Sequence, residues 1–326
     1  MRVIQFREAL REAMNEEMRK DENVFLLGEE VAEYNGAYKV SQGMLDEFGE
    51  RRIIDTPIAE LGFAGIAVGA GMNGLRPIVE FMTWNFAILA ADQIINSAAK
   101  MLQMSGGQYN VPIVFRGGNG TAGQLAATHS QSFEAFYAHV PGLKVITPSN
   151  PYDAKGLLKA AIQDDNPVVF LESEKMYGEK GEVPEEEYII PIGKAKVVRE
   201  GADCTIVSFG KIIKIAQEAA EAVAKEGISV EIIDLRTIRP WDKEAVISSV
   251  KKTNRLVVVE ESWPIASIAS EIAFRVQKDA FDYLDAPIVR ITQTDTPFAF
   301  STSLIDEALP DAKDVIDAVK RSMNQL

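Results

Sequence analysis

The sequence has very few residues of the kinds that build covalent cross-links and metal centres. It contains one cysteine, Cys204, and two histidines, His129 and His139, among 326 residues. A single cysteine excludes a disulfide framework within the chain and a cysteine-based metal cluster. Because Cys204 lies in the apolar run "CTIVSF", we expect a buried structural thiol there rather than a nucleophile.

Basic charge and long apolar runs are also scarce. The 34 lysines and arginines face 48 acidic residues, so the formal net charge is −14. This balance argues against binding to nucleic acids or to an anionic membrane, which both attract a basic surface, and it permits a basic protein partner. No apolar run reaches the ~18 residues of a membrane span, and the amphipathic N-terminus carries no cleavage-site pattern. We expect a cytoplasmic protein.

The pattern that is present is an alternation of helical periodicity with short β-branched runs, and a chain of 326 residues suggests two domains. In the first half we expect strands within 24–30, 76–82, 111–120 and 166–172, helices over 4–20, 41–48 (with Ser41 as N-cap), 59–72 and 86–104, and a strand followed by a helix that starts near Pro151 within 143–162.

A charged segment with glycine and proline, residues 174–192, interrupts this alternation, and a second series follows it. There we expect strands within 203–210, 228–236, 255–261 and 287–292, and helices over 212–226, 242–252, 266–279 and towards the C-terminus. Alternating strands and helices predict an α/β fold of two domains, each a mostly parallel sheet flanked by helices. We expect a first domain over 1–180, a linker over 181–192 and a second domain over 193–326.

The stretch "GAGMNG", residues 69–74, satisfies the dinucleotide pattern G-x-G-x-x-G. A real dinucleotide site follows a strand and opens a helix, because the phosphate binds the helix N-terminus. Here a helix runs into the glycines and a strand leaves them, so we interpret Asn73-Gly74 as a helix C-cap. Gly65, Gly69 and Gly71 are then expected to let this helix approach another backbone closely.

Glu60 stands at the start of that apolar, glycine-rich helix, in "DTPIAELGF". An acid in the first turn interacts favourably with the helix dipole, by about 0.3–1 kcal/mol, and this alone could explain it. The alternative is a partly buried carboxyl group whose pKa is raised, so that it holds or gives a proton near neutral pH. The local sequence does not separate the two interpretations.

Two further features are candidates for a site. His129 follows a glycine-rich segment that leaves the strand within 111–120, where open α/β sheets place ligands, whereas we expect His139 to be structural. Phe81, Trp84 and Phe86 lie close together at a strand-to-helix junction. They form either part of the core or an aromatic wall for a planar ligand, and periodicity cannot decide between them.

Long blocks of the sequence resemble a known family. "DTPIAELGFAGIAVGAGMNGLRPIVEFMTWNFAILAADQIINSAAK", "VPIVFRGGNG", "THSQSFEAFYAHVPGLKVITPSNPYDAKGLLKAAIQDDNPVVFLE" and "MYG" closely resemble the beta subunits of the decarboxylating component of pyruvate dehydrogenase (acetyl-transferring). These are thiamine-diphosphate enzymes of the transketolase-like family. The resemblance runs nearly end to end. It implies a pyrimidine-binding domain followed by a transketolase C-terminal domain.

The resemblance also implies roles for individual residues. Glu60 matches the glutamate that activates thiamine diphosphate through its pyrimidine ring, and Glu29, beside Glu30, matches an acid that contacts the cofactor. Phe86 matches the aromatic residue that packs on the pyrimidine. His129 matches a histidine that assists acyl transfer to the lipoyl arm. The family has Gln-His-Ser-Gln there, whereas this chain has Thr128 before the histidine, which puts the orientation of His129 in doubt.

Partners and metals follow from the same resemblance. The family's diphosphate–magnesium motif, Gly-Asp-Gly followed by Asn-Asn, is missing from this sequence. Magnesium and the diphosphate would therefore be held by an alpha subunit, in a heterotetramer of two alpha and two beta chains that docks on a dihydrolipoyl acyltransferase core. A potassium ion, held mainly by backbone carbonyls, would brace the loop that carries His129, and its ligands would be Ile113, Ala161, Ile162, Asp164 and Asn166.

Pyruvate is the substrate that the resemblance favours, and the expected enzyme is active only with its alpha subunit. The same chemistry on branched-chain 2-oxo acids or on acetoin is the alternative. A one-chain thiamine enzyme is disfavoured because the Gly-Asp-Gly and Asn-Asn motifs are missing. A non-catalytic homologue is disfavoured because Glu60 and His129 are both present.

Overall fold

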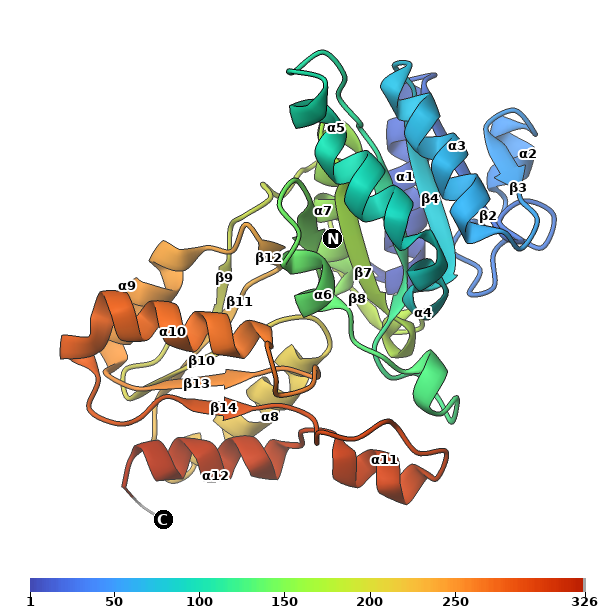
Figure 1. Cartoon of the computed structure of the whole chain (residues 1–326). Helices are drawn as coiled ribbons and strands as arrows, with labels where there is room; N and C mark the ends of the chain where they lie inside the picture. Colours follow the sequence, from blue (N-terminus) through green and yellow to red (C-terminus); the bar gives the residue numbers. More distant parts are fainter. Residues whose placement is uncertain (325–326) are drawn as a thin grey trace.

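The structure is a computed structural model that describes residues 1–324, and a seven-stranded sheet forms the centre of its first half (Figure 1). The strand order is β12-β6-β7-β5-β4-β2-β3. All neighbouring strands are parallel except β12, which runs antiparallel to β6. The strands are β2 (Val24–Gly28), β3 (Ile53–Asp55), β4 (Arg76–Thr83), β5 (Val114–Asn119), β6 (Lys144–Ile146), β7 (Val168–Ser173) and β12 (Thr237–Arg239).

Helices cover both faces of this sheet. One face packs on α1 (Phe6–Lys20) and α7 (Pro151–Gln163) through a single apolar cluster. The other face packs on α3 (Glu60–Met72), on the helical segment from α4 (Trp84–Ala87) to α5 (Ala99–Met104), and on α6 (Glu134–Ala138). The short helix α2 (Met44–Phe48) lies at the β3 edge, beside β3 (Figure 1). This double covering explains why the strands are apolar almost throughout.

A five-stranded sheet, ordered β14-β13-β10-β11-β9, forms the second half. Only β9 runs antiparallel. Its strands are β9 (Lys196–Arg199), β10 (Cys204–Ser208), β11 (Val230–Asp234), β13 (Leu256–Val259) and β14 (Val289–Ile291). One face packs on α8 (Ile212–Ala224) and α12 (Ala312–Ser322), and the other on α9 (Lys243–Thr253) and α10 (Ile268–Ala280). The short helix α11 (Thr302–Ala308) precedes α12.

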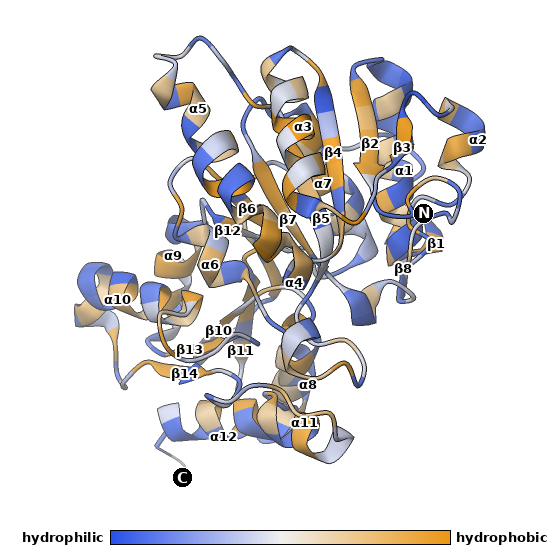
Figure 2. Ribbon diagram, turned by 45° about the vertical axis from the view of Figure 1, so that its right-hand side comes forward, coloured by the Kyte–Doolittle hydropathy of each residue, from blue (hydrophilic) through white to orange (hydrophobic). Residues whose placement is uncertain are grey.

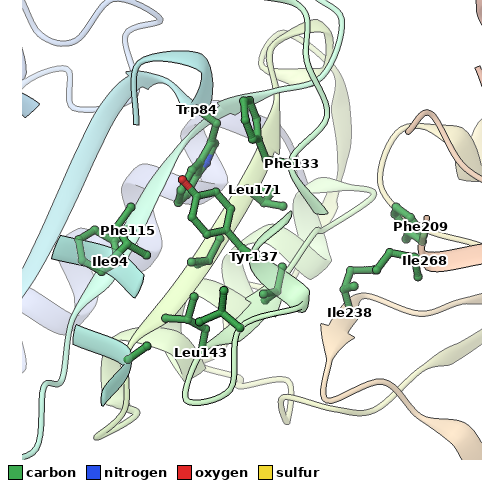
Figure 3. Packing of buried hydrophobic residues seen from close by; sticks show 14 of the residues in the cluster. Trp84, Ile94, Phe115, Phe133, Tyr137, Leu143, Leu171, Phe209, Ile238 and Ile268 are labelled. Atoms are coloured by element: carbon green, nitrogen blue, oxygen red, sulfur yellow. The ribbon is translucent and has the colours of Figure 1, made fainter. Parts of the chain in front are cut away.

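The two halves share one core. The cluster that contains Trp84 and Tyr137 continues through Ile238 to Phe209 and Ile268 (Figure 3). The ribbon coloured by hydropathy shows apolar strands inside and polar helix faces outside (Figure 2). No helix within residues 1–324 combines the length and the apolar character that crossing a membrane requires. The expectation of two α/β domains with mostly parallel sheets is confirmed.

Several local predictions were wrong. The first residues form a strand, β1 (Arg2–Gln5), which pairs antiparallel with β8 (Lys180–Val183) inside the segment that reads as a linker. Ser41 does not cap α2, which begins after Gly43, because the Ser41 hydroxyl donates to the carbonyl oxygen of Val31. Of the short strands, β3, β9 and β12 also escaped prediction.

The helix expected over 86–104 is broken into pieces. Short 3₁₀ (Ile88–Ala90) and π (Gln93–Ala98) segments separate α4 from α5. The "GAGMNG" prediction holds, because α3 runs into the glycines and ends at Met72 with Asn73 as its C-cap. The expected close approach to another backbone is limited to Gly71, which faces Val111 and Pro112. Gly65 faces the side chain of Gln93, and no atom of the described residues lies within 4 Å of a Cβ atom built at Gly69.

Cys204 lies on the buried strand β10, as expected, and burial raises the pKa of its thiol to about 11.

Candidate active site

Glu60 is the first residue of α3, and its side chain is buried. Glu60 is thus a first-turn acid, as the dipole interpretation requires, and also a poorly solvated carboxyl group. Its neighbours Ile58 and Leu61 are 83% and 51% exposed. The buried acid thus lies beneath an apolar surface.

Glu29 follows β2 and is buried beside Glu60. Burial, followed by the charge of Glu60 and a hydrogen bond with it, raises the pKa of Glu29 to about 7. Within residues 1–324, the Oε1 atom of Glu29 has no hydrogen-bond partner. A carboxyl group with a pKa near 7 donates when protonated and accepts when ionised, so Glu29 with its unpaired oxygen suits a nitrogen heterocycle.

Phe86 and His129 form the second part of the site. Phe86 lies on α4, directly after β4, and its half-buried ring meets the imidazole of His129 edge to face, with 5.2 Å between the ring centroids. Phe81 and Trp84 instead belong to the core, where Trp84 packs on Tyr137 (Figure 3). Of the three aromatic residues, only Phe86 therefore has the position of a wall for a ligand.

His129 is carried by the loop between β5 and α6, in a 3₁₀ turn over Ala127–His129. The hydroxyl of Thr128 lies 2.9 Å from Nδ1 of His129. This is the position at which the sequence departs from the family pattern, and the structure shows that the threonine keeps a polar partner on Nδ1. Nε2 of His129 is the nitrogen that remains for a substrate.

All four residues lie at one edge of the seven-stranded sheet. Glu29, Phe86 and His129 follow the carboxyl ends of β2, β4 and β5, which run parallel, and Glu60 follows β3. Parallel α/β sheets bind ligands at this edge. The contacts within each pair, Glu29 with Glu60 and Phe86 with His129, make it a candidate active site.

Comparisons with known proteins agree with this architecture. Residues 2–180 match the transketolase pyrimidine-binding domain, and residues 193–315 match the transketolase C-terminal domain. The pyruvate dehydrogenase E1 component subunit beta of Rhizobium meliloti is 60% identical over 98% of this chain and 70% of that protein. The mitochondrial beta subunit of Rattus norvegicus is 55% identical over 98% and 90%, respectively. The chain belongs to the family of pyruvate dehydrogenase E1 beta subunits.

A solved structure has the same fold as this chain. A split-gene transketolase, described as an inactive beta4 tetramer, matches 99% of both chains with a TM-score of 0.83 at 23% sequence identity. At this identity the likeness establishes the fold and nothing further.

The remaining sequence candidates lie elsewhere. His139 is exposed at the end of α6 and lines a cavity of about 720 Å³ with Arg239 and Trp241. The predicted potassium ligands Ile113, Ala161, Ile162, Asp164 and Asn166 lie around the turn from α7 to β7 and just before β5. This is the amino edge of the sheet, one strand length or about 20 Å from the loop that leaves β5. The expectation that such a site braces the His129 loop was therefore wrong.

Sequence reasoning missed a cluster of buried charged residues on the neighbouring strands β4, β5 and β7. Arg116 on β5 binds Glu172 on β7 through two hydrogen bonds of 2.7 and 2.5 Å and also donates to Glu80 on β4. The Tyr177 hydroxyl donates to Glu172 at 2.8 Å. The signal was visible, because Glu80, Arg116 and Glu172 each stand directly beside apolar residues within a strand.

Proposed function

We propose that this chain is the beta subunit of an enzyme that decarboxylates pyruvate with thiamine diphosphate and passes the acetyl group to a lipoyl arm. The observation that carries the proposal is the buried pair of Glu29 and Glu60, in which the pKa of Glu29 is raised to about 7. The unpaired Oε1 of Glu29 and the ring of Phe86 fit a planar nitrogen heterocycle. When bound, thiamine diphosphate supplies the electron sink that loss of carbon dioxide requires.

The residues of the chain then have distinct tasks. Glu60, which is buried, would hold a proton at a ring nitrogen of the cofactor's aminopyrimidine. Glu29, whose pKa is raised to about 7, would assist it, and Phe86 would orient the ring by packing against it. His129 acts in the transfer step as an acid–base group through Nε2, while Thr128 holds Nδ1.

An alpha subunit completes the site in this proposal. The sequence has no Gly-Asp-Gly and Asn-Asn motif, so the diphosphate and its magnesium are assigned to the alpha chain. The surface beside Glu60 supports such a partner, because Ile58, Leu61 and Ile66 expose between 51% and 83% of their area around the start of α3. We assign two alpha and two beta chains to the assembly, a cytoplasmic location, and docking to an acyltransferase core whose binding region is basic.

The potassium assignment is retained as a structural site at the amino edge of the sheet. The carbonyl oxygen of Ile113 accepts from the amide of Val168, and that of Ile162 accepts from Nε of Arg76. Each carbonyl has a second lone pair for an ion. However, Lys144 already binds the Asp164 carboxylate, which limits the charge left for potassium. A rise in the unfolding temperature with potassium chloride over sodium chloride, lost in Asp164→Asn, would support the site.

Activity of the assembled enzyme tests the proposal. The chain is purified alone and with an alpha subunit, and carbon dioxide release is measured with and without thiamine diphosphate. We expect release only from the assembled, cofactor-loaded protein, and faster release from pyruvate than from 3-methyl-2-oxobutanoate or acetoin. Release by the isolated chain would refute the shared site. A preference for the branched substrate or acetoin would leave the chemistry intact and replace the substrate.

A further inference from the structure

A polar cluster from the second domain holds one end of the loop that carries His129. The Glu261 carboxylate accepts from the Thr121 amide at 2.6 Å and from the Thr121 hydroxyl at 2.5 Å. Nζ of Lys211 donates to the Thr121 carbonyl oxygen at 3.0 Å and also contacts the Thr121 hydroxyl. Lys211 and Glu261 form an ion pair at 2.6 Å. The amide, carbonyl and hydroxyl groups of Thr121 are thus all bound by these two side chains.

The two charged residues are supplied by neighbouring strands. Lys211 follows β10 and Glu261 follows β13, and these strands are parallel neighbours in the five-stranded sheet. Their side chains are 15% and 7% exposed, so the pair is largely desolvated. The second sheet therefore points its carboxyl edge at the loop of the first domain. Buried charged pairs of this kind fix geometry more than they add stability.

The backbone before Thr121 is shaped for this contact. Gly120 has a φ of +76°, and a Cβ atom there would lie 3.1 Å from both carboxylate oxygens of Glu261. Only glycine combines this backbone angle with room for the carboxylate. The close approach of Glu261 is thus built into the loop.

The base of the loop is closed by hydrogen bonds inside the first domain. The Gly120 amide donates to the carbonyl oxygen of Gln131 at 3.0 Å, and the Phe133 amide donates to Oδ1 of Asn119 at 2.9 Å. Nδ2 of Asn119 donates to Glu134 at 2.9 Å. These bonds join residues 119–120, before Thr121, to residues 131–134, which follow His129. A shift of Thr121 is therefore expected to shift the residues next to His129 as well.

The tip of the loop has few other supports. Gln124 donates to the carbonyl oxygen of Phe300 at 3.2 Å, and residues 123–125 are exposed. In Figure 1 this segment projects from the first domain on the side of α11.

His129 is half-buried against Phe86. Two residues further on, Gln131 donates to Oδ1 of Asn85 through its amide and Nε2 at 3.2 and 3.1 Å. The base of the loop fixes how these contacts are presented. Misplacing a reacting group by about 1 Å can cost 100-fold in rate.

We propose that Lys211 and Glu261 are positioning residues, through which the second domain sets the place of His129 by holding Thr121. Their effect on acyl transfer rests on the role proposed above for His129, whereas their effect on the order of the loop does not. The pair touches neither Glu29 nor Glu60, so decarboxylation itself is expected to be spared.

The test uses the assembled, cofactor-loaded enzyme with Lys211→Met, and with Thr121→Val as a milder change that removes only the hydroxyl. Three quantities are measured: acyl transfer to a lipoyl domain, decarboxylation with an artificial electron acceptor, and hydrogen exchange of the amides of residues 121–133. Thr121→Ser should restore what Thr121→Val loses. Asp153→Asn is the matched control, because Asp153 and Arg236 form another buried ion pair between the two halves, at 2.6 Å, and their side chains make no hydrogen bond to residues 120–133.

We expect both Lys211→Met and Thr121→Val to slow acyl transfer at least tenfold, to change decarboxylation less than threefold, and to speed exchange in residues 121–133. Unchanged exchange in this segment would overturn the proposal. So would equal losses in both activities that Asp153→Asn reproduces. If His129→Ala leaves acyl transfer intact, the role of His129 is refuted, and the exchange data still decide whether the pair holds the loop.

Discussion

Glu29 and Glu60 lie side by side at the carboxyl edge of the first sheet, both buried, although one follows β2 and the other begins α3. Burial and the neighbouring charge of Glu60 raise the pKa of Glu29 to about 7. A buried carboxyl group beside a second acid is harder to ionise, which favours the protonated form of Glu29.

Replacing Glu60 with glutamine should lower turnover of the assembled enzyme by roughly 100- to 10,000-fold, the range typical of an acid–base group. Glutamine keeps the size of the side chain but cannot give or take the proton. Carbon dioxide release under saturating pyruvate measures the effect. Glu50→Gln, at an exposed position, is the control and should behave as the wild type. Near-normal turnover in Glu60→Gln would contradict the assigned role.

The buried carboxyl group of Glu134 should make the free energy of unfolding depend on pH. Burial raises the pKa of this carboxyl group from 4.5 to about 8. The folded state thus favours the protonated form, so Glu134 costs stability as pH rises from about 4.5 to 8. The slope is at most about 1.4 kcal/mol per pH unit. Glu134→Gln keeps an acceptor for Asn119 and has no proton to lose.

The free energy of unfolding of Glu134→Gln should therefore increase relative to that of the wild type as the pH rises from 5 to 8. Urea unfolding at pH 5, 6.5 and 8 measures the difference. The exposed Glu185→Gln should show no such trend. A constant difference across this range would show that Glu134 is ionised in the folded protein.

Removing the charge of Arg116 should lower the free energy of unfolding by a large amount. Its pKa is raised by the carboxylates of Glu172 and Glu80, against the effect of burial. Arg116→Met leaves both acids buried without their cation, which should cost about 3–5 kcal/mol. Adding Glu80→Gln and Glu172→Gln should recover part of this loss. Arg275→Met breaks only an exposed pair with Glu271 and should change unfolding little. Equal effects of the two arginine substitutions would contradict the burial argument.

Gly142 and Gly74 form a matched pair of positions. Both have a positive φ, of +100° and +94° respectively. At Gly142 a Cβ atom would lie 1.9 Å from the carbonyl oxygen of Ala99, whereas at Gly74 no atom of the described residues lies within 4 Å of it. Gly74→Ala should cost about 1–2 kcal/mol from its backbone angle alone. Gly142→Ala must also displace α5, so its unfolding temperature should fall clearly further. Equal shifts would mean that this contact relaxes freely.

Sequence reasoning reached the fold through local patterns that the structure preserves. Both ends of α3 were placed within one residue, because its continuous run of apolar and small residues and its Asn73 C-cap both lie in the chain itself. The break in 84–104 was not visible, because no glycine or proline occurs there and packing alone produces the 3₁₀ and π segments. The strand β12 was missed because its three residues depend on a distant partner.

The candidate site, too, was predictable in part: its residues were predicted, whereas the contacts between them were not. Glu60, Glu29, Phe86 and His129 were identified through family resemblance, and the sheet order explains why they share an edge. Contacts between them, such as that of Thr128 with His129, depend on side-chain placement and could not be predicted. The Arg116 cluster shows that a charge inside an apolar strand is a usable signal in itself.

Strand β12 belongs to the second half of the sequence but pairs with β6 in the first sheet. This pairing limits how the two halves can be exchanged between related proteins. Thr237 pairs with Ile146, and Arg239 pairs with Val145, so residues after the linker complete the first sheet. A fragment that ends in the linker would leave β6 as an unpaired edge, a surface that promotes aggregation. A chimera joined in the linker would combine β6 of one parent with β12 of another. A junction placed after Arg239 keeps this pairing within one parent.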